Sequence, residues 1–242
     1  MTVTSTIISP ALSKLAPAPA APAPAPTASA PAPAPTPVVH WDAAADEPYL
    51  ELPGIPGYRL TPHRFCAAEE DDLIELSNMP EVARWSYRRP YPYDRGHARA
   101  WIETMNTNTR DSVDALKADP SASVPVLPFV VVRDPNGRVV GDVGIWKEAD
   151  EMRPYARSLG YTLHPKLHRR GIGSASVGTV IAWARDRLDG AKVIDAGIEV
   201  DNEPSQALVA KLGFTKVMTK SLSWPEDKGG GERTLGVWRL HL

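Results

Sequence analysis

Residues 167–175 read Leu167-His168-Arg169-Arg170-Gly171-Ile172-Gly173-Ser174-Ala175, and this stretch decides how the fold is interpreted. Its glycines let the backbone turn sharply and bring N–H groups close to a ligand. The first turn of a following helix adds unpaired N–H donors and the positive end of the helix dipole. Arg169 and Arg170 add positive charge suited to phosphate. The stretch therefore predicts an anion site that binds a pyrophosphate.

The residues on either side of this loop predict a strand before it and a helix after it. Residues 158–163 are a short run typical of a strand, and His164-Pro165 ends the run. Residues 175–188 have apolar side chains at the spacing of one buried helical face, and Gly190 can end the helix. The predicted order is strand, basic glycine loop, helix.

Two phosphate-binding schemes with this order do not fit. A Walker-type loop ends in Gly-Lys-Ser/Thr, whereas this loop ends in Gly173-Ser174-Ala175, so no magnesium site is implied. A dinucleotide fingerprint needs a third glycine, where this chain has Ser176. Two mononucleotide-binding halves also do not fit into the sequence that follows the loop.

A second stretch supports a third scheme. It reads Val200-Asp201-Asn202-Glu203-Pro204-Ser205-Gln206-Ala207-Leu208-Val209-Ala210-Lys211-Leu212-Gly213-Phe214. The two stretches together resemble the GNAT superfamily of N-acetyltransferases, whose loop is Gln/Arg-x-x-Gly-x-Gly/Ala and whose second segment is Asn-x-x-Ser followed by Lys-Leu-Gly-Phe. Gly171 and Gly173 match that loop, and His168 stands where the family prefers Gln or Arg.

The resemblance implies that the chain binds acetyl-CoA as a co-substrate. Its diphosphate would lie against residues 168–174, namely His168, Arg169, Arg170, Gly171, Ile172, Gly173 and Ser174. The strand before the loop would splay from its neighbour over residues 160–163, leaving backbone groups of Tyr161 and Leu163 for the pantetheine arm. An N–H near Leu163 would face the oxyanion. Asn202 would hydrogen-bond the pantetheine.

Ser205 and Asp142 are the candidate catalytic residues. The resemblance places the Ser205 hydroxyl near the sulfur, as the proton donor to the thiolate, although Ser205 could equally cap the helix that Pro204 helps to start. Asp142 could accept the amine proton through water, with Glu199 as a weaker candidate. A position facing solvent on a strand would explain Asp142 as well.

The acceptor cleft of the superfamily is bordered by the segment between the first two helices. In this chain that segment contains Trp85, Tyr87, Arg88 and Arg89, which could select the substrate. Two arginines facing the cleft would favour an acidic acceptor. The same rings could instead pin a loop to the sheet.

Within the superfamily, two segments resemble the branch that acetylates ribosomal-protein N-termini. They are Arg59-Leu60-Thr61 and Met79-Pro80-Glu81-Val82-Ala83-Arg84-Trp85, and Ser205 before Lys211-Leu212-Gly213-Phe214 fits the same branch. The lack of an obvious base favours an α-amine, which has a pKa of about 8, over a lysine amine, which has a pKa of about 10.4. We therefore expect an acetyl-CoA-dependent N-acetyltransferase acting on a peptide N-terminus. The alternatives are acetylation of a small amine, such as an antibiotic or metabolite, and a non-catalytic acyl-CoA binder.

The expected fold is α+β, with a mixed, mainly antiparallel sheet and helices on both faces. Asp134-Pro135-Asn136-Gly137 predicts a hairpin turn, Asp94 predicts a helix start, and residues 111–125 are expected to be a loop or a frayed helix. Residues 16–37 contain only Ala, Pro, Thr and Ser, which predicts an extended, disordered run. We expect a disordered arm over residues 1–45 and one catalytic domain over residues 46–242.

Composition excludes several other classes. The net charge is -2 without a lysine-rich block, so no nucleic-acid groove is expected. No apolar run approaches the ~20 residues that span a bilayer. The single cysteine excludes an internal disulfide, and the histidines lack metal-binding spacing, so we expect no metal and a cytoplasmic location. A monomer and a homodimer are both compatible with the sequence.

Overall fold

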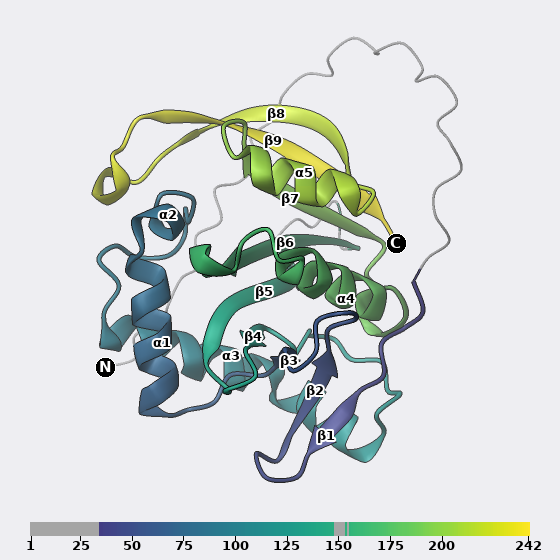
Figure 1. The fold of residues 1–242 in the computed structure, drawn as a ribbon. Helices are drawn as coiled ribbons and strands as arrows, with labels where there is room; N and C mark the ends of the chain where they lie inside the picture. The colour runs from purple at the N-terminus through teal and green to yellow at the C-terminus, as the bar shows by residue number, and fades with distance from the viewer. Residues whose placement is uncertain (1–33, 148–152, 154) are drawn as a thin grey trace, which may run out of the picture.

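The computed structural model describes residues 34–147, 153 and 155–242 (Figure 1). Most of the expected arm lies outside these residues. In the described part of the chain, nine strands form one sheet in the order β1-β2-β3-β4-β5-β6-β7-β9-β8. Its strands are β1 (His40–Asp42), β2 (Glu47–Glu51), β3 (Arg59–Thr61), β4 (Val131–Arg133), β5 (Val139–Lys147), β6 (Ala156–Leu163), β7 (Val193–Glu199), β8 (Thr215–Ser223) and β9 (Glu232–His241). The helices of the described residues are α1 (Ala67–Asn78), α2 (Pro80–Ala83), α3 (Arg95–Ala118), α4 (Ile172–Arg187) and α5 (Glu203–Lys211), with 3₁₀ turns at Pro165–Leu167 and Glu226–Lys228.

The expected mixed, mainly antiparallel sheet is confirmed. Only β6 and β7 run parallel among the described strand pairs, and every other neighbouring pair is antiparallel. The predicted turn between β4 and β5 is also confirmed. The N–H of Gly137 donates to the carbonyl of Asp134 at 2.9 Å, and Gly137 has a φ of 81°, which glycine adopts without strain.

Helices cover both faces of the sheet, as expected. Val131 belongs to the buried cluster that contains Leu73 of α1 and Ile102 of α3. Its neighbour Val132 belongs to the larger cluster that contains Trp183 of α4. Because successive strand residues point to opposite faces, α1 and the first half of α3 cover one face and α4 covers the other, where Leu116 at the end of α3 joins the α4 cluster. No helix in the described ranges is long and apolar enough to cross a membrane.

Two sequence-based boundaries are wrong. The segment assigned to the arm, residues 1–45, includes β1, which pairs with β2, so the sheet begins before residue 46. Asp94 does cap α3, accepting from the N–H of His97 at 2.9 Å, but α3 continues through residues 111–118 instead of fraying there. Ser112 and Leu116 continue its buried face. The hydroxyl residues among these buried positions made the apolar pattern look interrupted.

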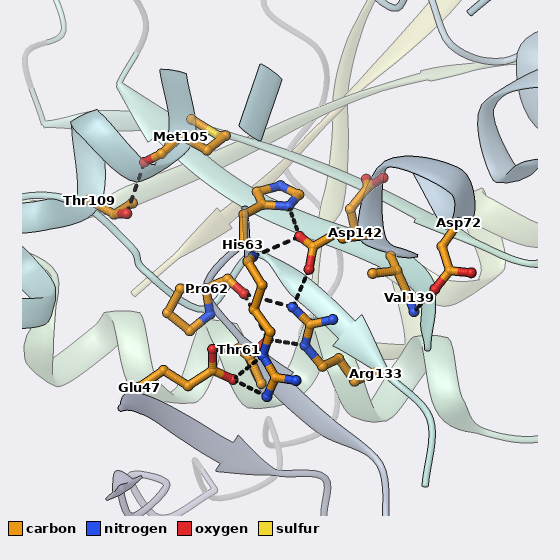
Figure 2. A network of polar contacts seen from close by, with 12 residues as sticks. Glu47, Thr61, Pro62, His63, Asp72, Met105, Thr109, Arg133, Val139 and Asp142 are labelled. Carbon is orange, nitrogen blue, oxygen red and sulfur yellow. Dashed lines mark hydrogen bonds and ion pairs between the residues drawn. The ribbon is translucent and has the colours of Figure 1, made fainter. Parts of the chain in front are cut away.

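A buried ionic cluster fastens the start of α1 to the sheet. The Glu69 carboxylate of α1 contacts the His63 Nδ1 atom at 2.6 Å and the Arg133 guanidinium of β4 at 2.5 Å. Arg133 also donates to the Thr61 hydroxyl of β3 at 2.8 Å, and Figure 2 shows His63, Thr61 and Arg133 around this contact. Burial raises the pKa of Glu69, but the hydrogen bond from His63 and the charge of Arg133 outweigh burial, so the pKa of Glu69 lies below its usual value.

Replacing Glu69 with Gln should therefore lower the free energy of unfolding by about 3 kcal/mol or more, because it leaves the Arg133 guanidinium buried without its carboxylate. Urea denaturation at pH 7 measures this change. The control is Glu75→Gln on the same helix, where a half-exposed ion pair with Arg138 is lost, and the expected change is below about 1 kcal/mol. Equal effects of the two substitutions would contradict the assigned role of Glu69.

The same cluster predicts a pH dependence of stability. Because the pKa of Glu69 is depressed in the folded state, its contribution is complete above the unfolded-state pKa of about 4.3 and is lost as the pH falls through the folded-state value. The free energy of unfolding should thus fall more steeply below about pH 4 in the wild type than in Glu69→Gln. Parallel acid-unfolding curves would argue against this.

Candidate active site

The sheet opens between β6 and β7. These strands pair through only three residue positions, Ala156 with Val193, Arg157 with Ile194 and Ser158 with Asp195. Beyond Ser158, β6 stays paired with β5 up to Leu163, while β7 stays paired with β9 up to Glu199. The facing edges of β6 and β7 therefore lack each other as partners over residues 159–163, as the expected splay requires.

Tyr161 bridges this opening with its side chain. Its hydroxyl donates to the backbone carbonyl of Ser205 on α5 at 3.2 Å. Burial raises the pKa of Tyr161, so the phenol remains a hydrogen-bond donor at neutral pH. The side chain of Tyr161 is thus engaged with α5, and its backbone lies on the open edge of β6.

The glycine loop turns through two left-handed residues. Arg169 has a φ of 60° and Gly171, the N-cap of α4, has a φ of 80°. The helix starts at Ile172, three residues earlier than expected, because residues 172–174 form its first turn. No side chain caps it, and its first internal bond runs from the N–H of Ala175 to the carbonyl of Gly171. The N–H groups of the first turn are therefore available to an anion.

His168 is used within the loop. Its Nε2 atom lies 3.0 Å from the carbonyl oxygen of Leu163, at the end of β6. This bond ties the start of the loop to the strand and occupies the Leu163 carbonyl. Arg169 and Arg170 are exposed beside it. The loop therefore supplies backbone amides and two arginines, which is the donor set that a diphosphate requires.

Gly173 lies where the loop, β6 and α5 converge. A Cβ atom on Gly173 would lie 3.4 Å from the Cδ1 atom of Leu208 on α5 and 3.8 Å from the Cδ2 atom of Leu163 on β6. A side chain at residue 173 would fill the space between the loop, β6 and α5, which glycine leaves open. The residues present thus fit the diphosphate and pantetheine of an acyl-coenzyme A.

The second motif forms the other wall of the opening. Asn202, not Ser205, is the N-cap of α5, because the Asn202 side-chain oxygen accepts from the N–H of Ser205 at 3.3 Å. The reading of Ser205 as the cap is wrong. Ser205 is partly buried in the first turn of α5, and no hydrogen bond within the described part of the chain occupies its hydroxyl. That hydroxyl remains available for chemistry.

Strand alternation defines an acceptor face, the face of β5, β6 and β7 opposite α4. Val143, Leu159 and Ile198 point toward the α4 side, in its buried cluster. Their neighbours Asp142, Gly160 and Glu199 therefore point to the acceptor face. Two carboxylates, one on each side of the opening, thus share this face.

Asp142 does not face solvent and is not free. Its Oδ2 atom lies 2.7 Å from the Nη2 atom of Arg89, and less than a fifth of either side chain is exposed. Arg89 also donates to the Ser77 hydroxyl at 3.3 Å. Burial raises the pKa of the neighbouring Tyr93 to about 12, so this phenol stays protonated. The Asp142 carboxylate is thus engaged by a buried guanidinium, which weakens the case for Asp142 as the base.

Glu199 is the better-placed carboxylate. It ends β7, beside the opening, and borders a cavity of about 390 Å³ lined by Arg84, Val200, Asp201, Glu232, Arg233 and Thr234. Burial raises the pKa of Glu199 despite the Arg233 guanidinium at 3.1 Å, so Glu199 is a stronger base than an ordinary exposed carboxylate. The sequence offered no sign of this preference, because the burial of Glu199 depends on distant segments.

The loop after α2 fits both predictions made for it, namely contact with the acceptor cleft and attachment of the loop by its aromatic rings. Arg88 lies over the ring of Trp146 on β5 at 5.5 Å, and Arg89 reaches Asp142, so both lie against the acceptor face. In contrast, the Tyr87 ring packs against Trp224 at 5.3 Å, which pins the loop. Trp85 packs under the Arg84 guanidinium at 4.2 Å.

Trp146 is a residue of the acceptor face that the sequence analysis missed. A Cβ atom on Gly160 would lie 2.7 Å from the Trp146 ring, and one on Gly144 would lie 3.4 Å from it. Gly144 and Gly160 are direct cross-strand partners, so they form a flat floor under the indole. The signal in the sequence was a glycine two residues before a tryptophan, paired with a glycine on the next strand.

A family model described as Acetyltransferase (GNAT) domain matches residues 59–215. The chain therefore belongs to the GNAT acetyltransferase family, and it is an acetyl-CoA-dependent N-acetyltransferase. No curated protein matches the sequence significantly. Among the described residues, no group of three or more His, Cys, Asp or Glu side chains is placed to hold a metal ion.

Solved structures share the fold. The ribosomal-protein-S5-alanine acetyltransferase from Vibrio fischeri has a TM-score of 0.59 and 20% identity, over 80% of this chain and 96% of that chain. RimJ from Mycobacterium smegmatis, in complex with CoA-disulfide, has a TM-score of 0.59 and 17% identity, over 77% and 84%. The microcin C7 self-immunity acetyltransferase MccE, in complex with acetyl-CoA and AMP, has a TM-score of 0.57 and 17% identity, over 76% and 92%.

Substituting Gly173 with Val should weaken binding of coenzyme A at least about 100-fold, because the new side chain occupies the corner between the loop, β6 and α5. Calorimetry with acetyl-CoA and with its free thiol measures the affinity. The matched control is Gly178→Val in the same helix, where a Cβ atom would also lie 3.4 Å from a leucine, Leu212, which directly follows α5. If both variants lose affinity equally, helix packing and not the cradle is responsible.

Proposed function

We propose that the protein transfers the acetyl group of acetyl-CoA to the α-amine of a peptide or protein N-terminus, by direct attack in a ternary complex. One observation carries the proposal. Glu199, a partly buried carboxylate whose pKa is raised by burial, lies at the end of β7 beside the opening, on the acceptor face. A carboxylate is a weak base, so even with Glu199 present an N-terminal amine, which is partly neutral near pH 7, remains an easier acceptor than a lysine amine.

The coenzyme supplies an acetyl group activated as a thioester. The amides of residues 169–174, with Arg169 and Arg170, would hold its diphosphate. The open edge of β6, including Tyr161 and Leu163, and the wall at Asn202 would hold its pantetheine arm. A backbone N–H of β6 would donate to the thioester carbonyl oxygen and so stabilise charge that develops on it.

The chain's own side chains would move the two protons. The amine nitrogen forms a bond to the acetyl carbon and loses a proton to the Glu199 carboxylate, directly or through a water. The carbon–sulfur bond breaks, and the Ser205 hydroxyl at the start of α5 donates a proton to the thiolate. Ser205 regains a proton from solvent water, and Glu199 releases its proton to solvent, so that both groups return to their starting states. Asp142 then has a positioning role, because its contact with Arg89 fixes the loop beside the acceptor face.

The solved structures with the same fold support a peptide or protein N-terminus as the acceptor and leave one alternative open. The Vibrio fischeri protein is a ribosomal-protein-S5-alanine acetyltransferase, whereas MccE is a microcin C7 self-immunity acetyltransferase. A small-molecule amine is therefore the second candidate. The exposed indole of Trp146 on the acceptor face, which has a planar surface suited to stacking, favours it. We also propose that the enzyme acts in the cytoplasm, as a monomer or a homodimer.

A thiol-release assay distinguishes the acceptors. Each peptide should be offered with a free N-terminus and with a blocked N-terminus but a free lysine, beside aminoglycosides and polyamines. Turnover only of the free N-termini supports the proposal. Turnover only of small amines supports the alternative, and coenzyme binding without turnover of any amine would leave a non-catalytic binder.

Replacing Glu199 with Gln should lower kcat/KM for the best acceptor about 100-fold, because the amine loses its proton acceptor. The wild-type rate should fall with decreasing pH as Glu199 becomes protonated, at a pH above the value for an ordinary glutamate, and the variant should lack this acid limb. Glu232→Gln is the control, since Glu232 lies in the same cavity wall but bonds Ser221 and Ser223. An unchanged acid limb in Glu199→Gln would assign the base elsewhere, with Asp142→Asn as the next variant.

A further inference from the structure

The hairpin that joins β8 to β9 crosses the opening in the sheet. Its tip, residues 224–231, extends from β8 and β9, which lie with β7 on one side of the opening. The tip contacts the acceptor loop, defined here as residues 84–91, which follows α2 on the other side of the opening. Figure 1 shows the end of this hairpin beside α2. The residues that meet in this contact are about 140 positions apart in the chain.

Lys228 makes the central contact. Its ammonium group donates to the backbone carbonyls of Ser86, Tyr87 and Arg89, with a distance of 3.1 Å to the Tyr87 oxygen. An ammonium group has three N–H donors, so one side chain uses its whole donor capacity on one loop. Burial of the ammonium group against the loop lowers the pKa of Lys228.

Further contacts of the hairpin reach the same loop. The buried Trp224 packs against the ring of Tyr87 at 5.3 Å, and the Asp227 carboxylate accepts from the N–H of Tyr91 at 3.2 Å. The contacts are spread along the acceptor loop. The tip therefore sets the path of the loop's backbone.

Arg233 connects this contact to the proposed base. Its Nη1 atom donates to the carbonyl of Arg84 at 2.9 Å and to the Glu199 carboxylate at 3.1 Å. Its Nη2 atom donates to the carbonyl of Lys228 at 3.1 Å. One guanidinium thus holds the acceptor loop, the hairpin tip and Glu199 in a fixed relation.

We propose that Lys228 is a positioning residue for the acceptor. By fixing three carbonyls of the acceptor loop, it places Arg88 and Arg89 against the acceptor face and closes that side of the opening. This inference rests on the proposed acyl transfer at the same site. It does not involve the glycine loop at residues 169–174, which lies at the start of α4 on the other side of the sheet. Loss of Lys228 should therefore affect the acceptor and not the coenzyme.

The test compares Lys228→Met with Lys220→Met in the full-length chain. Lys220 lies on β8 of the same hairpin and is exposed, so its substitution removes the same charge without touching the loop. Lys228→Met should raise KM for the best acceptor at least about tenfold, the loss of roughly one charged hydrogen bond, and change kcat less than about threefold. Its affinity for coenzyme A should stay within about twofold of the wild type. Lys220→Met should alter none of these constants.

Hydrogen exchange supplies a readout that needs no acceptor. In Lys228→Met, amides of residues 84–91 should exchange faster than in the wild type, while those of α4 should not. An unchanged KM, or unchanged exchange in the loop, would overturn the proposal, and so would equal losses of coenzyme and acceptor binding. If the wild type acetylates no amine, the proposed function fails, and the exchange comparison alone then decides whether Lys228 holds the loop.

Discussion

The structure depends on how few backbone pairs join β6 to β7. An extended strand needs hydrogen-bond partners for its N–H and C=O groups, and an edge left open in the middle of a sheet is costly unless something else meets it. Three residue pairs hold these strands together at Ala156–Ser158, and the strands then part. The fold thereby creates a gap bordered by backbone donors and acceptors, and the end of β6 leads directly into the glycine loop. A long, polar, extended arm ending in a diphosphate is the ligand shape that satisfies both features.

The gap also divides the sheet into two parts, and side chains must reconnect them. Three contacts do so. The Tyr161 hydroxyl donates to the Ser205 carbonyl, and the Lys228 ammonium donates to carbonyls of the acceptor loop. The Arg233 guanidinium donates to both the Glu199 carboxylate and the Arg84 carbonyl. The first lies on the α4 side and the other two on the acceptor side. The opening is therefore held at a fixed width by hydrogen bonds from the two sides, and preorganised donors cost no reorganisation when a reaction occurs.

Local patterns allowed much of this to be predicted from the sequence. The glycines and arginines of residues 167–175 act through backbone geometry, so the loop and the helix after it follow from neighbours in the chain, and so does the turn at Asp134 to Gly137. The family and its fold were predicted correctly from two such segments. What failed depends on distant partners. Arg89 meets Asp142 from 53 positions away, and Lys228 meets the acceptor loop across about 140 positions, so no periodicity or spacing could reveal that Asp142 is engaged or that Glu199 is buried.

Charge pairing on the acceptor face argues against electrostatic selection of an acidic acceptor. The sequence suggested such selection if Arg88 and Arg89 faced the cleft. Arg89 does, but its charge is matched by the Asp142 carboxylate at 2.7 Å, as that of Arg233 is matched by Glu199 at 3.1 Å. Each carboxylate and its arginine form a nearly neutral pair, and Arg88 lies over an aromatic ring. The two pairs therefore contribute little long-range attraction for an acidic acceptor, which leaves shape and hydrogen bonding at the acceptor loop as sources of selectivity beside the charge of Arg88. That requirement explains why the loop's backbone is held so closely by the hairpin tip.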